Sequence, residues 1–109
     1  MTFWFPGCGP CRGEMPHLEA VLKKYPKDKV VYLGIQTLPE QDEYVASFMK
    51  GTKYSFMPLH GTRQLDMDYK VRGNPANYII DQNGKIQYWG FMIDDGSEKS
   101  LDAMIQSLL

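Results

Sequence analysis

The sequence predicts an α/β fold in which a mixed central sheet carries helices on both faces. Over the first half of the 109 residues, short apolar runs alternate with segments of helical periodicity. Later, the turn sequence Asp81-Gln82-Asn83-Gly84 separates two strand-like runs and favours a β-hairpin. Alternating strands and helices give parallel pairing, whereas the hairpin adds an antiparallel pair, so we expect a mixed sheet.

The composition is typical of a globular chain with one hydrophobic core, and we expect a single domain over residues 1–109. Apolar residues make up 43% and charged residues 23%, which argues against a disordered chain. The net charge of −1 gives no indication of nucleic acid or an anionic membrane surface as a partner. No run reaches the roughly 18 apolar residues of a membrane span, so we expect no membrane contact by this segment.

The first two elements are a strand and a long helix. Residues 2–6 form a short apolar run, as expected of a buried strand. A helix is predicted from Cys8 to Tyr25, and Pro16 inside it is expected to kink it. One face of this helix carries apolar side chains at helical spacing, namely Met15, Leu18, Leu22 and Tyr25.

The next two elements repeat the pattern. The near-continuous apolar run Val30–Ile35 is typical of a central parallel strand. Thr37 and Glu40 have the spacing of a capping box, and Pro39 suits the first turn of a helix. That helix is expected to carry Tyr44, Val45, Phe48 and Met49 and to end near Gly51.

The second half contains shorter elements. Phe56 to Leu59 is predicted as an edge strand, because Pro58 cannot donate a ladder hydrogen bond. A short helix is expected over Leu65–Tyr69, followed by a strand over Asn77–Ile80 that the hairpin turn pairs with Lys85–Phe91.

We expect a last helix capped by Asp95 and Glu98, with one apolar face made of Leu101, Met104, Ile105 and Leu108. From the strand periodicity we also expect four aromatic side chains to be packing residues: Trp4, Tyr88, Trp89 and Phe91.

The two cysteines of the chain lie three residues apart, in Cys8-Gly9-Pro10-Cys11. A strand that leads into such a pair at a helix start is typical of a redox motif. Unpaired N–H groups and the helix dipole lower the pKa of a thiol at that place, and the second sulfur lies one turn away. A static disulfide or two inert core thiols is the alternative.

Several motifs resemble the thioredoxin superfamily, and within it the TlpA/ResA-like thiol–disulfide oxidoreductases. The first block is Phe3-Trp4-Phe5, then Cys8 to Arg12, then Glu14-Met15-Pro16. The second is Tyr69 to Pro75, followed by Tyr78 to Asp81 and Asn83 to Ile86, which resembles the cis-proline loop and final hairpin of that family. The resemblance covers essentially the whole chain and implies a thioredoxin-like fold.

The resemblance implies a role for each cysteine. Cys8 is the expected nucleophile, and Cys11 is the resolving thiol that attacks the mixed disulfide and leaves a Cys8–Cys11 disulfide. Pro75 is the expected cis-proline, in a loop that faces Cys8. The backbone of Asn74 is expected to pair with an extended substrate segment.

The turn residues Gly7, Gly9 and Pro10 are the other expected substrate contacts. Gly9-Pro10 is also the dipeptide of thioredoxin, whose potential is about −270 mV, so the resemblance favours a reductant. The chain departs from the family at Gly7, where Trp is usual, and at Asn74, where Thr or an aliphatic residue is common. It also lacks the family's usual N-terminal hairpin, so we expect a domain fragment.

Glu14 has two interpretations. Three residues after Cys11, a half-buried carboxylate could accept the Cys11 proton, and the resemblance supports this role. Spacing alone favours an exposed helix residue near Arg12 or lysines.

No cofactor is expected. His17 and His60 are interpreted as surface or packing residues, because a structural zinc site needs a second ligand pair. Arg12 follows Cys11 where c-type haem attachment needs His.

The expected function is reduction of protein disulfides, with electrons from an upstream thiol donor. One alternative is a binding module with passive cysteines. Another is a peroxiredoxin-type peroxidase, whose pattern needs Thr where Phe5 stands. The resemblance implies an extracytoplasmic location with an N-terminal tether, and a cytoplasmic role stays open.

Overall fold

The computed structural model describes residues 1–91 and 95–109, and the strands in this part form one sheet in the order β3-β2-β1-β4-β5. The central strand β1 pairs in parallel with β2 and antiparallel with β4. At the two edges, β3 pairs in parallel with β2, and β5 pairs antiparallel with β4. The predicted mixed sheet is therefore confirmed. The strand bounds are β1 (Thr2–Trp4), β2 (Leu33–Gln36), β3 (Met57–His60), β4 (Ala76–Ile80) and β5 (Ile86–Gly90).

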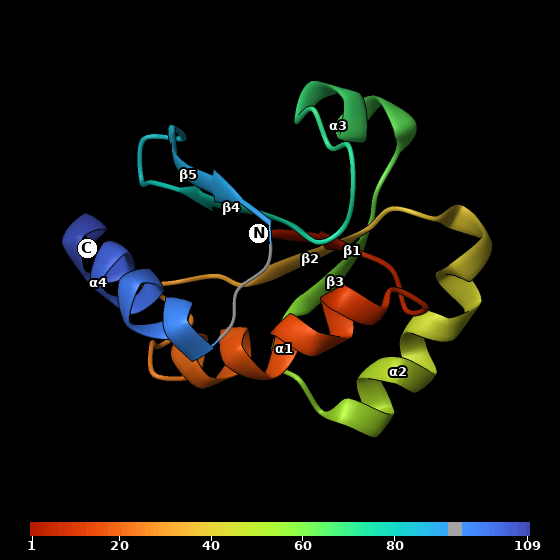
Figure 1. The fold of residues 1–109 in the computed structure, drawn as a ribbon, viewed down its shortest axis with the longest axis horizontal. Coiled ribbons are helices and arrows are strands. Elements are labelled where there is room, and N and C mark those ends of the chain that lie inside the picture. The colour runs from red at the N-terminus through yellow and green to blue at the C-terminus, as the bar shows by residue number, and fades with distance from the viewer. Residues whose placement is uncertain (92–94) are drawn as a thin grey trace.

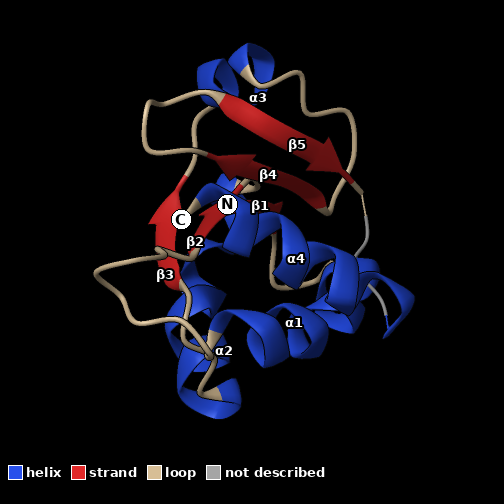
Figure 2. Ribbon diagram, turned by 90° about the vertical axis from the view of Figure 1, so that its left-hand side faces the viewer, coloured by secondary structure: helices blue, strands red, loops and turns tan. Residues whose placement is uncertain are grey.

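Helices cover both faces of the sheet, as predicted (Figures 1 and 2). On one face, α1, α2 and α4 pack over a core that includes Trp4, Met15 and Phe56. On the other face, α3 lies over a second cluster that includes Phe3 and Tyr78. Phe3 and Trp4 point to opposite faces because side chains alternate along a strand. The helix bounds are α1 (Gly9–Leu22), η1 (a 3-10 helix, Pro39–Tyr44), α2 (Val45–Thr52), α3 (Arg63–Asp68), η2 (a 3-10 helix, Asp95–Ser97) and α4 (Glu98–Leu108).

The first two strands are shorter than predicted. β1 ends at Trp4, because the N–H of Cys8 donates to the carbonyl of Phe5 at 3.0 Å and turns the chain toward α1. β2 begins at Leu33 and not at Val30, because the N–H groups of Lys29 and Val30 both donate to the carbonyl of Pro26 and form a turn. Val31 is 60% exposed, so part of the apolar run lies outside the core.

The first long helix also differs at its ends. Cys8 is its N-cap and not its first residue, and α1 ends at Leu22, three residues before the predicted end at Tyr25. The N–H of Tyr25 donates to Leu22, a tightened turn that leads into Pro26, which cannot continue a helix. The helix runs on through Pro16.

The predicted capping box at Thr37 and Glu40 is wrong. Leu38 stands at the N-cap of η1 without a side-chain cap bond. The carboxamide of Gln36 bonds both the N–H and the carbonyl of Leu38, while the Thr37 hydroxyl donates to the Trp4 carbonyl at 3.4 Å. The Thr37 hydroxyl is therefore bonded to β1 and does not cap η1. The predicted end of the following helix is close to its observed end at Thr52.

The second half follows the prediction closely. β3 is an edge strand, and Thr62 caps α3 by accepting from the N–H of Leu65 at 3.0 Å. The β4–β5 hairpin has Gly84 at φ +81°, a left-handed conformation that favours glycine. The Asp81 carboxylate accepts from the N–H groups of Asn83 and Lys85, both at 2.9 Å.

The last helix buries Leu101 and Ile105 as predicted, but its cap is different. Ser97 stands at the N-cap, and the Glu98 carboxylate lies 2.7 Å from Nδ1 of His17 on α1, so it is not a capping group. The side chain of Asp95 lies outside the described part of the structure.

The aromatic prediction holds for Trp4 and Tyr88 and fails for Trp89 and Phe91. Trp4 is fully buried and Tyr88 is half-buried, whereas Trp89 and Phe91 are 65% and 64% exposed. Both lie at the end of the edge strand β5, and because side chains alternate along a strand, they share one face of the sheet, which is exposed to solvent there. Their rings contact each other edge to face, with centroids 6.3 Å apart.

Candidate active site

Cys8 and Cys11 form a disulfide at the N-terminus of α1, with Cα atoms 5.3 Å apart. Cys8 is the N-cap and has extended backbone, while Pro10 occupies the first turn, where its missing N–H removes no helix bond. The N–H of Cys11 points back at Sγ of Cys8, at 3.2 Å. A helix N-terminus in this position favours a thiolate on Cys8 when the pair is reduced.

The two sulfurs differ in access. Cys8 retains 4% of its surface and Cys11 retains none, while Gly7, Gly9 and Pro10 around them are exposed. A sulfur that approaches from solvent therefore meets Cys8 before Cys11. This order agrees with the predicted roles of nucleophile and resolving thiol.

Gly7 has a partner that the sequence did not indicate. Its N–H donates to Oε1 of Gln41 on η1, at 2.7 Å. A Cβ at position 7 would lie 3.1 Å from the end of the Gln41 side chain, so this side chain occupies the space beside the turn. No spacing rule joins residues 34 positions apart, and only the fold brings them together.

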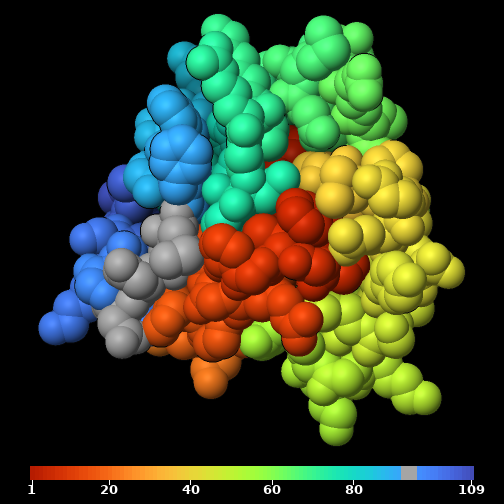
Figure 3. All heavy atoms as spheres, turned by 45° about the vertical axis from the view of Figure 1, so that its right-hand side comes forward, coloured from red at the N-terminus to blue at the C-terminus, as the bar shows by residue number. Residues whose placement is uncertain are grey.

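The Asn74–Pro75 peptide bond is cis, Pro75 is buried and Asn74 is half-buried. Phe3 pairs with Ala76 across β1 and β4, so this loop lies beside the end of β1, from which the chain runs to Cys8. Figure 3 shows the teal segment that leads into β4 against the red and orange segment that leads into α1.

Glu14 is fully buried, so its interpretation as an exposed helix residue is wrong. Its Oε2 accepts a hydrogen bond of 2.8 Å from Nδ2 of Asn77 on β4. Arg12, the cation nearest in sequence, lies over the ring of Phe48 instead, at 5.6 Å from its centroid. Burial, and then the charge of Glu14, raises the pKa of the Tyr32 hydroxyl, which keeps this phenol neutral.

Sequence reasoning missed Asn77 and Thr2. Both are buried, and the Thr2 hydroxyl donates to Oδ1 of Asn77. An asparagine inside an apolar strand indicates a buried polar contact, because such a group needs partners. That signal was present at position 77, but it names no partner.

The two histidines lie apart from the disulfide in separate ion pairs. His17 pairs with Glu98 at 2.7 Å, and His60 pairs with Asp42 at 3.0 Å. Among the described residues, no three His, Cys, Asp or Glu side chains are grouped so as to hold a metal ion.

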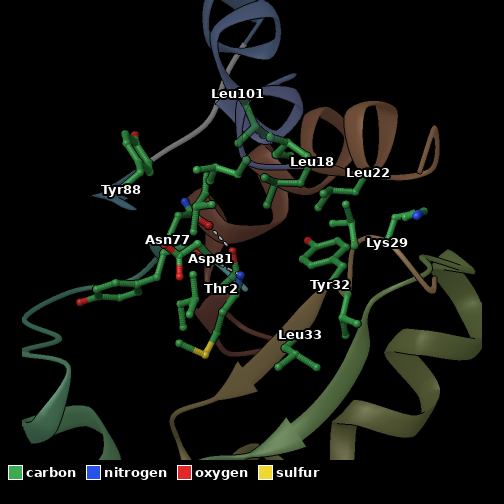
Figure 4. Close-up of a pocket in the computed structure, with 18 of the residues that line it drawn as sticks. Thr2, Leu18, Leu22, Lys29, Tyr32, Leu33, Asn77, Asp81, Tyr88 and Leu101 are labelled. Carbon is green, nitrogen blue, oxygen red and sulfur yellow. Dashed lines mark hydrogen bonds between the residues drawn. The ribbon is translucent and has the colours of Figure 1, made fainter. Parts of the chain in front are cut away.

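A cavity lies away from the cysteines. It has a volume of about 430 Å³, lies between the sheet and helices α1 and α4, and is lined mainly by apolar side chains such as Leu18, Tyr32 and Leu101 (Figure 4). None of its lining residues belongs to the Cys8–Cys11 turn or to the Asn74–Pro75 loop. The candidate active site is therefore a surface turn and not this cavity.

A sequence model described as the AhpC/TSA family matches residues 1–89. The chain belongs to the AhpC/TSA family. Two curated relatives of this AhpC/TSA protein narrow the resemblance. The thioredoxin-like protein YneN of Bacillus subtilis is 32% identical over 105 residues, which cover 94% of this chain and 62% of YneN. The thiol-disulfide oxidoreductase ResA of Bacillus thuringiensis is 30% identical over 87 residues, or 79% of this chain and 50% of ResA.

A solved structure shows the fold of this AhpC/TSA protein. A DsbE-type thiol:disulfide interchange protein from Chlorobium tepidum superposes with a TM-score of 0.85 at 22% identity, covering 98% of this chain and 76% of that one. The thioredoxin-like fold and the resemblance to ResA-like proteins are therefore confirmed. The chain spans between 45% and 62% of the length of the curated relatives that it matches. None of the described helices of this AhpC/TSA protein is long and apolar enough to span a bilayer.

Proposed function

We propose that this protein is a thiol–disulfide oxidoreductase that reduces disulfides in partner proteins. The observation that carries the proposal is the Cys8–Cys11 pair at the N-terminus of α1, with the N–H of Cys11 directed at Sγ of Cys8. The names of its relatives support the same chemistry. The unequal access of the two sulfurs supports the division of roles between them.

The first step uses the reduced pair. The Cys8 thiolate attacks a substrate disulfide, so that a Cys8–substrate S–S bond forms and the substrate S–S bond breaks. The leaving sulfur takes the electron pair and a proton from solvent. A buried Cys11 cannot compete as the attacking group, since it exposes no surface.

The second step closes the protein disulfide. Cys11 gives its proton to the carboxylate of Glu14, one helical turn away, and its thiolate attacks Sγ of Cys8. The Cys8–Cys11 bond forms and the Cys8–substrate S–S bond breaks. The leaving substrate sulfur takes the electron pair and a proton from solvent, so the substrate departs as a dithiol. An external thiol donor then reduces the pair again, so the reaction needs no cofactor.

Substrate contacts are assigned to the exposed turn Gly7, Gly9 and Pro10, and to the loop at Asn74 and Pro75. An extended substrate segment beside Asn74 gains backbone hydrogen bonds by strand addition. Because such bonds use no side chain, this mode accepts many sequences around the substrate cysteine.

The proposed setting is extracytoplasmic, with substrates and an electron donor that are proteins bearing exposed disulfides or dithiols. The resemblance to ResA-like oxidoreductases supports this setting, and the parent chain is expected to carry its tether upstream of this segment. The Gly9-Pro10 turn supports a reductant with a potential near about −270 mV.

The test measures the potential of the Cys8–Cys11 pair in thiol redox buffers, with alkylation and mass counting. Cys11→Ser should accumulate a mixed disulfide on Cys8, whereas Cys8→Ser should accumulate none. A pair that never cycles would favour a binding module, and peroxide consumption without a disulfide substrate would favour a peroxidase. A potential above about −180 mV would reverse the proposed direction of electron flow.

A further inference from the structure

Asn77 uses both ends of its carboxamide in buried hydrogen bonds. Nδ2 donates to Oε2 of Glu14 at 2.8 Å and to the carbonyl of Phe91, while Oδ1 accepts from the Thr2 hydroxyl. A carboxamide nitrogen has two hydrogens, so these two donor bonds use both. Figure 4 shows the side chains of Thr2 and Asn77 directed toward one another.

The neighbours fix which way the amide points. The Phe91 carbonyl only accepts, so the atom that faces it must be the nitrogen. A flipped amide would place its oxygen against two acceptors, the Phe91 carbonyl and the Glu14 carboxylate. Thr2 adds a donor on the opposite side, where the oxygen lies. An N–H is thereby held toward Glu14.

This contact lies in a place where charge is costly. Glu14 is 0% exposed, Thr2 is 2% exposed and Asn77 is 6% exposed. A carboxylate removed from water is stabilised only by the hydrogen bonds that it receives, and a donor to the charged form favours ionisation. The Asn77 N–H is such a donor.

We propose that Asn77 is a positioning residue that keeps the buried Glu14 carboxyl ionised and oriented as the proton acceptor of Cys11. The proposal rests on the proposed oxidoreductase function and extends it to a residue on β4, 63 positions from Glu14. Thr2 acts one step further out, by holding the Asn77 amide in the productive orientation.

The consequence is a specific dependence on pH. Glu14 can accept the proton that leaves Cys11 in the second step only when its carboxyl is ionised. Without the Asn77 donor, Glu14 stays protonated to higher pH, so the rate of the resolving step falls at neutral pH and recovers on the alkaline side. A purely structural role for Asn77 would lower stability without moving this profile.

Among the described residues, the Tyr32 hydroxyl and the α-amino group of Met1 interact electrostatically with Glu14, and their titration must be separated from that of Glu14. Tyr32 approaches from the segment before β2, and the α-amino group of Met1 approaches from the start of β1. Burial lowers the pKa of that amino group to about 6, and the charge of Glu14 opposes the shift. Tyr32→Phe and an acetylated N-terminus therefore serve as backgrounds in which neither group titrates.

The experiment follows the Glu14 carboxyl directly, by ¹³C NMR of side-chain-labelled glutamate in the reduced protein, beside the pH profile of disulfide exchange. Asn77→Leu keeps the size of the side chain and removes the donor. It should raise the pH midpoint of Glu14 by about one unit or more, a tenfold change in proton affinity. Thr2→Val should give a smaller shift of the same sign, and Asn77→Asp a larger one, since two carboxylates then share the site.

Ile79→Ala is the matched control, because Ile79 lies two residues along β4 and also lines the cavity but has no polar group. It should destabilise the fold and leave the Glu14 midpoint unchanged. An unchanged midpoint in both Asn77→Leu and Thr2→Val would overturn the proposal. If Asn77→Leu does not fold, Thr2→Val decides alone, since it replaces a hydroxyl by a methyl of similar size.

The two proposals can fail separately. A wild-type protein that exchanges no disulfides contradicts the proposed function, while the NMR titration still tests the Asn77–Glu14 contact. A wild-type protein that exchanges disulfides with a profile that Asn77→Leu does not move contradicts only the positioning role.

Discussion

A hydrogen bond joins Gly7, the residue before Cys8, to the side chain of Gln41 on η1. The N–H of Gly7 donates to Oε1 of Gln41 at 2.7 Å, and a Cβ on residue 7 would lie 3.1 Å from that same amide group. The absence of a side chain at position 7 and the presence of an amide at position 41 therefore belong together. Through this bond η1 holds the residue that precedes the nucleophile.

Gln41→Ala removes the acceptor of the Gly7 N–H. A hydrogen bond of this kind contributes about 1 kcal/mol, so the Gly7 amide should exchange with deuterium roughly five- to tenfold faster. Hydrogen exchange followed by NMR measures this rate. Glu43→Ala, an exposed change on the same η1 helix, should leave the Gly7 rate unaltered, and an equal rate in both variants would show that the bond does not restrain the turn.

Glu14→Gln tests the proposed base. The new amide oxygen can still accept from Nδ2 of Asn77, so the fold should be preserved. Loss of the proton acceptor should slow formation of the Cys8–Cys11 disulfide by about 100-fold near neutral pH, as expected for general base catalysis. Stopped-flow measurement of the resolving step gives the rate. Glu19→Gln makes the same chemical change on the same helix, at a carboxylate that accepts from Ser55, and should have the wild-type rate.

The lowered pKa of the Asp81 carboxyl leads us to predict that the fold loses stability in acid. The N–H of Lys85 and then the amide of Gln87 lower the pKa of this carboxyl below its usual 3.8. The unfolded chain therefore binds the proton more tightly, and the stabilisation is present above pH 3.8 and is lost as the pH falls through the folded pKa.

Asp81→Ala should accordingly lower Tm at pH 7, and the difference from wild type should close below pH 3.8. Thermal unfolding across this range measures it. Asp28→Ala, at an exposed loop position, should show no pH-dependent difference. A difference for Asp81→Ala that is the same at pH 2.5 and pH 7 would contradict the assignment.

The two tryptophans allow the same substitution to be compared at a buried and at an exposed position for its effect on the free energy of unfolding. Trp4 is fully buried and packs against Phe48 and Phe56, with ring centroids 4.9 and 5.2 Å away. Trp4→Ala should cost about 3–5 kcal/mol, whereas Trp89→Ala should stay within about 0.5 kcal/mol of wild type. Urea denaturation measures both. A cost above about 1.5 kcal/mol for Trp89→Ala would mean that its ring packs in solution.

Patterns that are local in sequence predicted the structure well. The strand–cysteine–helix order at Cys8 and the Asp81 to Gly84 hairpin depend on neighbouring residues, and both were found as predicted. The cap at Thr37 failed because the N–H and the hydroxyl of Thr37 both donate to the carbonyl of Trp4, a contact 33 positions away that propensity alone cannot weigh. The prediction that Trp89 is a packing residue failed, because the alternation of side chains assigns a residue to a face of the sheet but does not show whether another element covers that face.

The site was predicted only in its local part. Cys8 and Cys11 lie in one motif, and the resemblance supplied the loop at Pro75. Glu14 remained ambiguous, because its hydrogen-bond partner Asn77 lies 63 residues away and no spacing along the chain indicates it. Contacts of this length arise from the topology of the sheet, so no periodicity along the chain encodes them.

The central position of β1 has a consequence for how reactivity arises during folding. The β4–β5 hairpin joins neighbouring parts of the chain, and the β2–β3 pair spans 24 positions. By contrast, β1 must meet β2 more than 30 residues on and β4 more than 70 residues on. Pairing across such separations is slow, since chain entropy is lost before contacts form. The helix turn that activates Cys8 directly follows β1. We therefore expect the nucleophile to become reactive late in folding, after a stage at which both cysteines behave as ordinary thiols.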